Sequence, residues 1–423
     1  MALTGDRTFV GFGFGAIQAG LFLYEAYRAG TFSRLVCAEI QAERIARVRA
    51  AGGMFTVNIA HADRIEQARV GPVELLNPTD PTERAALVAA VAAAAEAATA
   101  LPSVAGYADV APILAAGLAT KHAMDAPPLL VYCAENTPQA ADILAEHVRA
   151  ALPDESPAAA MDDACFVDTV IAKMSGLAPA ADSLAPIAPG DPAAFLVEAF
   201  NRILIGARCP DAAGRTRFTR GIPVFTEKPD LVPFEAAKLY CHNAGHATAA
   251  YLAQLAGLTT MDQLTARPDL RVLIRRAMVD EAGAALVHRY AGVDVLFTPA
   301  AMAAYADDLI VRMVNPHLRD SVARVARDPA RKLGWDDRLV GAMRLALDAG
   351  IRPRALALGV AAAWEALHAA GNTPLPAGQS LRALWPAADE ATAAQCLDLV
   401  TAARAQLAAW RRAPVSAPWH LSA

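Results

Sequence analysis

The segment Arg7-Thr-Phe-Val-Gly11-Phe-Gly13-Phe-Gly15-Ala16 decides the fold of this 423-residue chain. Its apolar start predicts a strand, and the apolar spacing beyond Ala16 predicts a helix that follows directly. Gly11 permits a tight turn, Gly13 lets the backbone approach a pyrophosphate, and Gly15 continues the loop. The small Ala16 takes the place of the third glycine, so helix and strand still pack closely. Free N–H groups at the helix start suit phosphate oxygens, so the segment predicts a dinucleotide-binding turn.

A carboxylate at the end of the next expected strand completes this site. The strand covers residues 34–38, and Glu39 follows it directly. A carboxylate at this position accepts hydrogen bonds from the adenosine ribose hydroxyls and repels a 2′-phosphate. The sequence therefore predicts NAD as the cofactor in preference to NADP.

Short β-branched runs alternate with helical patterns through the first 175 residues or so. Strands that alternate with helices predict βαβ units and a parallel sheet with helices on both faces. We expect an inserted hairpin at residues 55–60 and 68–76, and we interpret residues 85–100 as a buried helix that runs into a strand. The other expected strands cover residues 9–12, 34–38, 129–133 and 166–172, and the expected helices cover residues 16–29 and 41–51.

The remainder of the chain is nearly all helical in pattern. Residues 176–192 are rich in Pro, Ala and Gly and predict a linker or surface loop. We therefore expect an α/β Rossmann-type domain with a mainly parallel sheet over residues 1–190 and a mostly α-helical domain over residues 191–423. The expected helices of the second domain cover residues 233–256, 271–290, 299–314, 335–349 and 353–370.

Composition excludes several classes of protein. The net charge of −5 and a pI near 6.0 provide no basic surface for nucleic acid. From the N-terminal pattern we expect no signal peptide, and residues 85–100 are too weakly apolar to span a membrane. The six cysteines lack Cys-x-x-Cys or Cys/His ligand spacing, so we expect reduced thiols, no metal site and a cytoplasmic location.

One expected helix carries an unusual set of polar side chains. At about 100° per residue, Glu235, Lys238, Asn243 and His246 lie within an arc of about 140°. Each of them alone could be a satisfied polar group in a core, but the set favours a site. Gly245 costs this helix about 1 kcal/mol relative to alanine, which indicates that something approaches the backbone there. An amine, a carboxylate, an amide and an imidazole on one face predict acid–base chemistry.

The residues of this helix resemble a known family. Lys238-x4-Asn243-x2-His246 is similar to the signature of the polyol-specific long-chain dehydrogenases, the mannitol dehydrogenase family. The Cys-Ala-Glu135-Asn136 strand end resembles a second motif of that family. The segment from Asn315 to Leu333 resembles the branch that uses mannitol 1-phosphate most closely. These matches cover nearly the whole chain.

The resemblance implies a role for each residue in the transfer of a hydride between NAD(H) and a polyol or its phosphate. Lys238 is the general base, and Asn136 and Asn243 donate hydrogen bonds to the developing alkoxide. His246 orients the substrate, and Glu235 helps to pass the proton to solvent. A lysine acts as a base only when it is neutral, so burial must lower its pKa from about 10.4. The resemblance also implies a metal-independent monomer.

Three basic residues suit a phosphorylated substrate. Arg327, Arg331 and Lys332 lie in the segment that resembles the phosphate-using branch, and guanidinium and ammonium groups bind phosphate dianions. A solvated basic turn is the alternative. Two elements depart from the family pattern: Lys173 stands in a segment where the family has Asp-Arg-Ile-Val/Thr-Pro, and Ile203 stands where the family has tryptophan.

Other functions fit the same outline. An unphosphorylated hexitol, or a hexonate or uronate, could be the substrate, with Arg331 and Lys332 facing solvent or binding a carboxylate. A protein of another class would bind NAD without turnover, but binding alone does not require Lys238. A β-hydroxyacid dehydrogenase shares the domain outline but not the Lys-x4-Asn-x2-His spacing.

Overall fold

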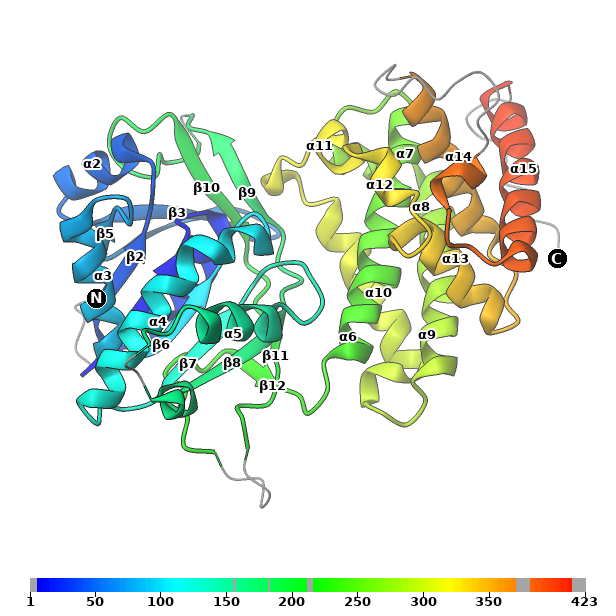
Figure 1. Cartoon of the computed structure of the whole chain (residues 1–423). Coiled ribbons are helices and arrows are strands. Elements are labelled where there is room, and N and C mark those ends of the chain that lie inside the picture. The colour runs from blue at the N-terminus through cyan, green and yellow to red at the C-terminus, as the bar shows by residue number, and fades with distance from the viewer. Residues whose placement is uncertain (1–5, 155–156, 182, 211–215, 370–380, 413–423) are drawn as a thin grey trace. The chain divides into compact units, whose positions relative to one another are not determined.

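The computed structural model describes residues 6–154, 157–181, 183–210, 216–369 and 381–412. The chain folds into two compact units, residues 1–231 and 232–423 (Figure 1). The expected boundary at residue 190 therefore lies inside the first unit. Strands β10 to β12, which follow residue 190, pair with strands of the first unit and so belong to its sheets.

The first unit is built on an eight-stranded sheet in the order β12-β11-β8-β7-β6-β1-β2-β5. The six strands from β8 to β5 are parallel, whereas β11 runs antiparallel to β8. This arrangement confirms the expected parallel-dominated sheet of a Rossmann-type domain. The strands are β1 (Arg7–Phe12), β2 (Phe32–Ala38), β5 (Glu74–Leu76), β6 (Ala94–Thr99), β7 (Leu129–Cys133), β8 (Ala164–Val170), β11 (Ile203–Ile205) and β12 (Phe225–Glu227).

Helices cover one face of this sheet, and helices together with a second sheet cover the other. Apolar side chains of α3 (Pro81–Ala93), α4 (Tyr107–Ala123) and α5 (Ala140–Ala150) form one core with the sheet. The opposite core holds the segment η1–α1 (Gln18–Leu23, then Tyr24–Ala29), together with α2 (Ala42–Ala50) and strands of the second sheet. The expected helix-then-strand at residues 85–100 is confirmed as α3 followed by β6.

The second sheet has four strands in the order β4-β3-β10-β9. The hairpin expected at residues 55–60 and 68–76 is confirmed for β3 (Phe55–Ala60) and β4 (Ile65–Val70), but residues 74–76 join the large sheet as β5. The linker or surface loop predicted at residues 176–192 is wrong for residues 176–179, whereas the described residues from 180 to 192 form no named helix or strand. Its start forms β9 (Ser175–Pro179), which pairs antiparallel with β10 (Ala193–Glu198), so backbone hydrogen bonds order a segment whose composition suggested a loop.

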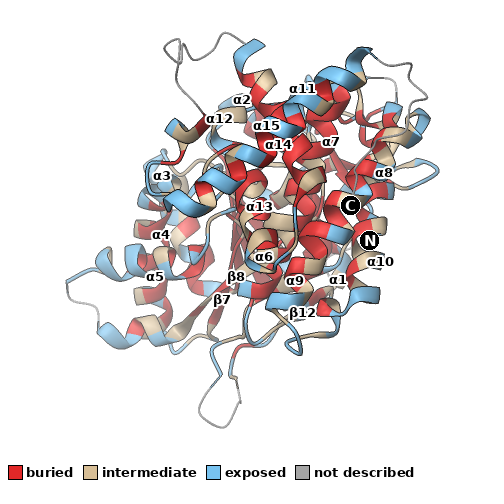
Figure 2. Cartoon of the chain, turned by 90° about the vertical axis from the view of Figure 1, so that its right-hand side faces the viewer, coloured by how far each residue is buried: buried red, intermediate tan, exposed pale blue. Residues whose placement is uncertain are grey.

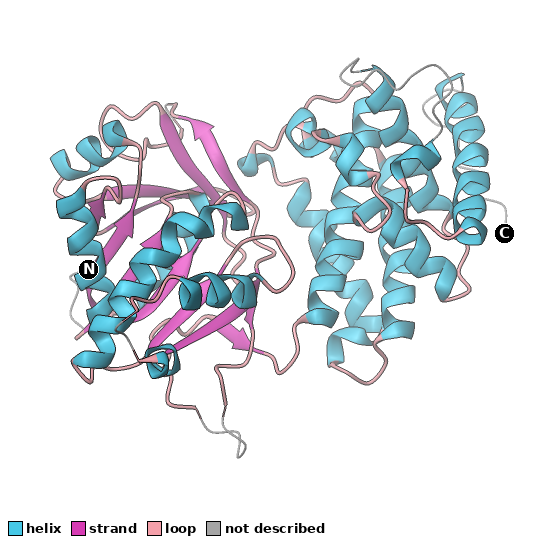
Figure 3. Ribbon diagram, viewed as in Figure 1, coloured by secondary structure: helices cyan, strands magenta, loops and turns pink. Residues whose placement is uncertain are grey.

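The regular secondary structure in the described part of the second unit is helical, apart from one isolated bridge between Thr260 and Ser321 (Figure 3). Helix α14 is buried along most of its length, and α7 packs against it (Figure 2). None of the helices described is long and apolar enough to cross a membrane. The helices are α6 (Val232–Ala237), α7 (Ala244–Leu255), α8 (Pro268–Arg276), α9 (Ala284–Arg289), α10 (Pro299–Met313), α11 (Val322–Ala326), α12 (Pro329–Lys332), α13 (Arg338–Asp348), α14 (Arg354–Ala369) and α15 (Glu390–Arg412).

Two of the long expected helices contain a π-helical segment. Segment η4 (Lys238–Asn243) joins α6 to α7, and η6 (Ala277–Gly283) joins α8 to α9. A third π-helical segment, η1, follows the glycine loop of the first unit. Such segments are rare in proteins, and those that occur often lie at functional sites. Two of the three adjoin residues that the sequence analysis assigns to a site.

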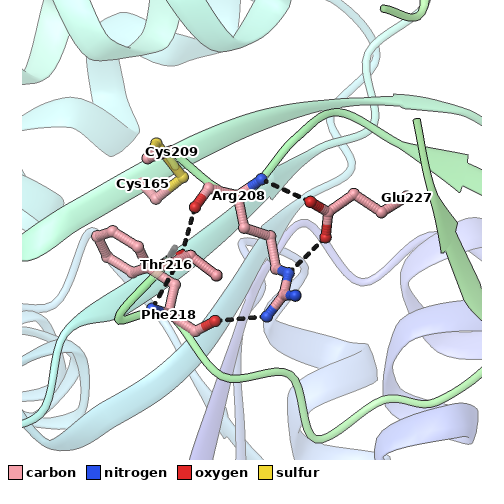
Figure 4. Close-up of a disulfide and its surroundings, with 6 residues drawn as sticks. All are labelled: Cys165, Arg208, Cys209, Thr216, Phe218 and Glu227. Carbon is pink, nitrogen blue, oxygen red and sulfur yellow. Dashed lines mark hydrogen bonds and ion pairs between the residues drawn. A yellow bond between two sulfur atoms is a disulfide. The ribbon is translucent and has the colours of Figure 1, made fainter. Parts of the chain in front are cut away.

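The expectation of reduced thiols is wrong for one pair of cysteines. Cys165 of β8 and Cys209 form a disulfide across 44 residues of sequence (Figure 4). The two are brought together because β11, which precedes Cys209, pairs with β8. Beside the disulfide, Arg208 donates to Glu227 and to the Phe218 carbonyl, so side-chain bonds as well as the disulfide hold this segment. The other four cysteines are free and buried.

Candidate functional site

The glycine loop has the geometry that phosphate binding requires. Gly13 has a φ of 84°, and its N–H donates to the carbonyl of Ala38 at 3.1 Å. A β-carbon on Gly13 would lie 2.9 Å from the carbonyl oxygen of Ala100, so no larger residue fits. Gly15 differs, since a β-carbon there would meet no atom within 4 Å. Other residues therefore pack closely against Gly13, whereas the space beside Gly15 is open. The helix begins directly after Gly15, at Ala16.

A buried glutamine beside this loop was not found by sequence reasoning. The side chain of Gln18 is fully buried in η1, and a β-carbon on Gly11 would overlap its amide. Within the described part of the chain, neither amide atom of Gln18 has a hydrogen-bond partner. Gly11 is therefore needed for the packing of η1 on β1, in addition to the tight turn. The helical pattern alone does not distinguish such a residue from a surface glutamine.

Glu39 lies at the C-terminal end of β2, as expected, and is 6% exposed. Its Oε1 accepts from the N–H groups of Ile40 at 2.7 Å and Gln41 at 2.8 Å. These bonds fix the carboxylate at the start of α2. Together with the glycine loop, Glu39 supplies the chemistry that an adenosine ribose and a pyrophosphate need, so these residues fit an NAD molecule.

The end of β7 is organised by Glu135. Its carboxylate accepts from the Thr99 hydroxyl and the Leu101 N–H, both at 2.8 Å, and from the Tyr107 hydroxyl. These bonds tie the end of β7 to the loop after β6 and to the first turn of α4. Asn136 follows directly and is exposed. It belongs to the first unit and Lys238 to the second, so their joint action remains a prediction.

The π-helical segment η4 changes the geometry of the helix that carries Lys238. In a π-helix the backbone bonds join residues i and i+5 rather than i and i+4. Lys238 and Asn243, the first and last residues of η4, are therefore one turn apart on the same face. Ideal α-helical geometry placed Asn243 about 140° away from Lys238. The structure thus brings these two side chains closer to alignment than the sequence pattern predicted.

The pKa of Lys238 is lowered to about 8. Burial is the largest cause, the positive charge of Arg338 adds to it, and Glu235 acts in the opposite direction. This is the direction that a general base requires, because a larger fraction of the amine is then neutral near physiological pH.

His246 is held in its neutral form. Burial lowers its pKa to about 4, and its Nε2 lies 3.6 Å from Oδ2 of Asp320. Asp320 is itself bound by the Arg324 guanidinium through two bonds of 2.6 Å. His242, one turn earlier, is also buried, and its pKa is lowered well below the usual value by burial and by His246. Asp320 and Arg324 were part of the matched motif, but sequence reasoning gave them no role.

The three residues expected to bind phosphate lie in different surroundings. Lys332 is buried, and its ammonium donates to the carbonyls of Val325 at 2.6 Å and of Arg327. Arg331 is 53% exposed and donates to Asp337 at 3.1 Å. The Arg327 side chain is exposed. The structure therefore does not gather these three side chains around one point, because two of them face outward while Lys332 fastens the turn before it.

The two departures from the family pattern are linked to one another. Lys173 is buried and donates to the carbonyls of Glu198 at 2.5 Å and Phe200 at 2.9 Å. The Glu198 carboxylate accepts from the N–H of Met174. Ile203 is fully buried at the start of β11. Lys173 thus bonds to the segment between β10 and β11 that ends at Ile203, so both departures lie in one part of the first unit.

Among the residues that the structure describes, no three His, Cys, Asp or Glu side chains are grouped as metal ligands. The site residues thus fall into two sets. The first unit carries Gly11, Gly13, Gly15, Ala16, Glu39 and Asn136, and the second carries Glu235, Lys238, Asn243, His246, Arg327, Arg331 and Lys332.

Comparison with known proteins agrees with this division. Residues 7–213 match the model of the mannitol dehydrogenase Rossmann domain, and residues 230–380 match that of the mannitol dehydrogenase C-terminal domain. A mannitol-1-phosphate 5-dehydrogenase of Bacillus licheniformis is 34% identical over 74% of this chain and 76% of its own length. One from Paenarthrobacter aurescens is 35% identical over 60% of this chain and 61% of its own length.

Solved structures share the fold. The mannitol 2-dehydrogenase of Pseudomonas fluorescens, solved with NAD and D-mannitol, aligns over 97% of this chain and 95% of its own, with a TM-score of 0.67 and 16% identity. A D-sorbitol dehydrogenase aligns over 86% of this chain and 81% of its own, with a TM-score of 0.67 and 15% identity. The chain therefore belongs to the mannitol dehydrogenase family, a family of NAD-dependent dehydrogenases that act on secondary alcohols.

Proposed function

We propose that this protein interconverts mannitol 1-phosphate and fructose 6-phosphate with NAD(H), and that Lys238 is its general base. The observation that carries the proposal is the lowered pKa of Lys238 on a π-helical turn that aligns it with Asn243. The names of the two relatives given above support the phosphorylated substrate.

The first unit holds the cofactor in this proposal. The loop at Gly13 and Gly15 would hold the pyrophosphate, and Glu39 would accept hydrogen bonds from the ribose. A bound NAD would supply the acceptor for the hydride of the alcohol carbon. Because Oε1 of Glu39 already accepts two backbone N–H bonds, the carboxylate is preorganised for this role.

The second unit supplies the proton chemistry. Neutral Lys238 takes the hydroxyl proton of the substrate during oxidation, and Glu235, three residues earlier, passes this proton toward solvent. The amides of Asn243 and Asn136 donate to the alkoxide as it forms. His246, neutral and held near Asp320, donates or accepts a hydrogen bond to orient the polyol.

A panel of substrates tests the proposed reaction. Mannitol 1-phosphate and fructose 6-phosphate should be turned over far more efficiently than mannitol, fructose and hexuronates, as followed by NADH absorbance. Preference for an unphosphorylated hexitol or a sugar acid would contradict the assigned substrate. Binding of NADH with no turnover of any member of the panel would contradict the assigned activity.

The Lys238→Ala variant tests the proposed base. General acid–base catalysis contributes about 10²–10⁴-fold, so kcat should fall by at least that range. NADH binding, measured by fluorescence titration, should stay within threefold of the unmodified protein, because Lys238 is assigned no contact with the nucleotide. Retained turnover would remove Lys238 from the mechanism.

A further inference from the structure

A carboxylate in the second unit holds two arginines at once. Oδ2 of Asp337 accepts from Arg331 at 3.1 Å, and Oδ1 of the same group accepts from Nε of Arg338 at 2.8 Å. One negative charge therefore faces two guanidinium groups. Arg331 is 53% exposed and lies at the rim of this cluster, whereas the side chain of Arg338 is only 13% exposed.

The Arg338 guanidinium has donor groups that form no hydrogen bond within the described residues. Within the described residues, the bond from Nε to Asp337 is the sole hydrogen bond of its side chain. Nη1 and Nη2 thus remain as a planar pair of donors on a largely buried, permanently charged group. A guanidinium in this state is suited to bind a phosphate through two parallel hydrogen bonds.

Arg338 lies beside the helix that carries Lys238. It is the first residue of α13, and Gly341, one turn further on, packs against Tyr240 of η4. A β-carbon on Gly341 would lie 2.5 Å from Cε1 of Tyr240, so the ring of this η4 residue packs directly on the backbone of α13. The positive charge of Arg338 lowers the pKa of Lys238, His246 and Lys332 alike, which agrees with a location among them.

We infer that Arg338, held by Asp337, binds the phosphate group of the sugar-phosphate substrate through Nη1 and Nη2. This inference rests on the proposed function. It also gives Lys332 a different role from the one its sequence suggested, because its ammonium is already used by the carbonyls of Val325 and Arg327. Lys332 is then a positioning residue that fastens the turn between α11 and α12, ahead of the segment that carries Asp337 and Arg338.

Two substitutions of Arg338 test the inference. Arg338→Met removes the charge at similar length, and Arg338→Lys keeps the charge but loses the paired donors. Loss of two hydrogen bonds from a charged donor should raise KM for fructose 6-phosphate about 100-fold or more in Arg338→Met. Arg338→Lys should lie between this variant and the unmodified enzyme.

A matched control separates this effect from loss of a surface charge. Arg275 on α8 pairs with Asp307 on α10 and is 47% exposed. Arg275→Met should leave KM for fructose 6-phosphate unchanged. In Arg338→Met, kcat/KM should fall far more for fructose 6-phosphate than for fructose when both are reduced at a pH well below 8, where Lys238 is protonated with or without the charge of Arg338. The affinity for NADH should stay within threefold. Inorganic phosphate should inhibit the unmodified enzyme competitively against fructose 6-phosphate and inhibit Arg338→Met much more weakly.

The outcomes separate the two proposals. If the unmodified enzyme turns over neither sugar phosphate, the proposed function fails and the inference fails with it. If it uses fructose 6-phosphate and Arg338→Met leaves KM and phosphate inhibition unchanged, only the inference is overturned. An equal loss on fructose and fructose 6-phosphate, or a loss confined to hexuronates, also overturns it. Should Arg338→Met not fold, Arg338→Lys and the phosphate inhibition decide.

Discussion

The side chain of Met278 occupies the space beside the α-carbon of Gly245. A β-carbon on Gly245 would overlap Cγ and Sδ of Met278, which belongs to the π-helical segment η6. The Sγ of Cys241, in η4, also lies 3.5 Å from the Met278 carbonyl. The two π-helical segments of the second unit therefore meet at this point, next to the residues assigned to acid–base chemistry.

Gly245→Ala should destabilise the protein, although alanine favours a helix by about 1 kcal/mol. Overpacking a tight core costs about 1–3 kcal/mol, so the net change is a lower free energy of unfolding. In a Met278→Ala background the overlap is gone, and the same substitution should stabilise the protein. Denaturant unfolding of the four proteins in a double-mutant cycle measures the coupling. Additive effects would show that Met278 is not the reason for the glycine.

Polyol oxidation should speed up as the pH rises through about 8, because only neutral Lys238 accepts the proton. The charge of Arg338 lowers the pKa of Lys238 and that of Glu235 raises it. The rise of kcat/KM with pH, which is the acidic limb of its pH profile, should therefore occur at higher pH in Arg338→Met and at lower pH in Glu235→Gln. Arg338→Lys, which keeps the charge, should shift it least. A limb that stays in place in both variants would contradict the assignment of this pKa to Lys238.

NADH should bind more tightly than NADPH, because the Glu39 carboxylate accepts from ribose hydroxyls and repels a 2′-phosphate. In Glu39→Ala we expect NADH affinity to fall about tenfold and the preference for NADH to shrink, since a hydrogen bond to a charged group is lost. Fluorescence titration with both nucleotides measures this. Glu43→Ala, which changes an exposed carboxylate on the helix α2 that follows Glu39, is the control. Equal affinity of the unmodified protein for NADPH would refute the role of Glu39.

Reduction of the Cys165–Cys209 disulfide should lower stability. The chain-entropy model assigns about 4 kcal/mol to a disulfide that closes a loop of this length. The observed loss should be smaller, because the bonds of Arg208 to Glu227 and Phe218 still hold the segment. Melting with and without a dithiol reductant measures the change. The double variant Cys165→Ala/Cys209→Ala should show no further response to reductant, and an equal response there would place the effect elsewhere.

Local patterns were sufficient for the class of fold and for most helices. The glycine loop predicts its strand–helix turn because positive φ at Gly13 is a local property of the backbone. The expected helices at residues 299–314 and 353–370 agree with α10 and α14 to within a residue at each end, because the apolar periodicity reflects which face is buried. The linker or surface loop predicted at residues 176–192 was wrong at its start, because pairing between β9 and β10 depends on a partner that composition does not reveal.

The candidate site, like the fold, was only partly predictable from the sequence. The sequence by itself determined which residue types stand on one helix, and the spacing of Lys238, Asn243 and His246 is enough to indicate a site. Only the tertiary structure decided that η4 is π-helical, that Lys332 is used by backbone carbonyls, and that Asp337 joins Arg331 to Arg338. The reason is physical: burial and charge act through space, so the partners of a side chain depend on which elements the fold packs together.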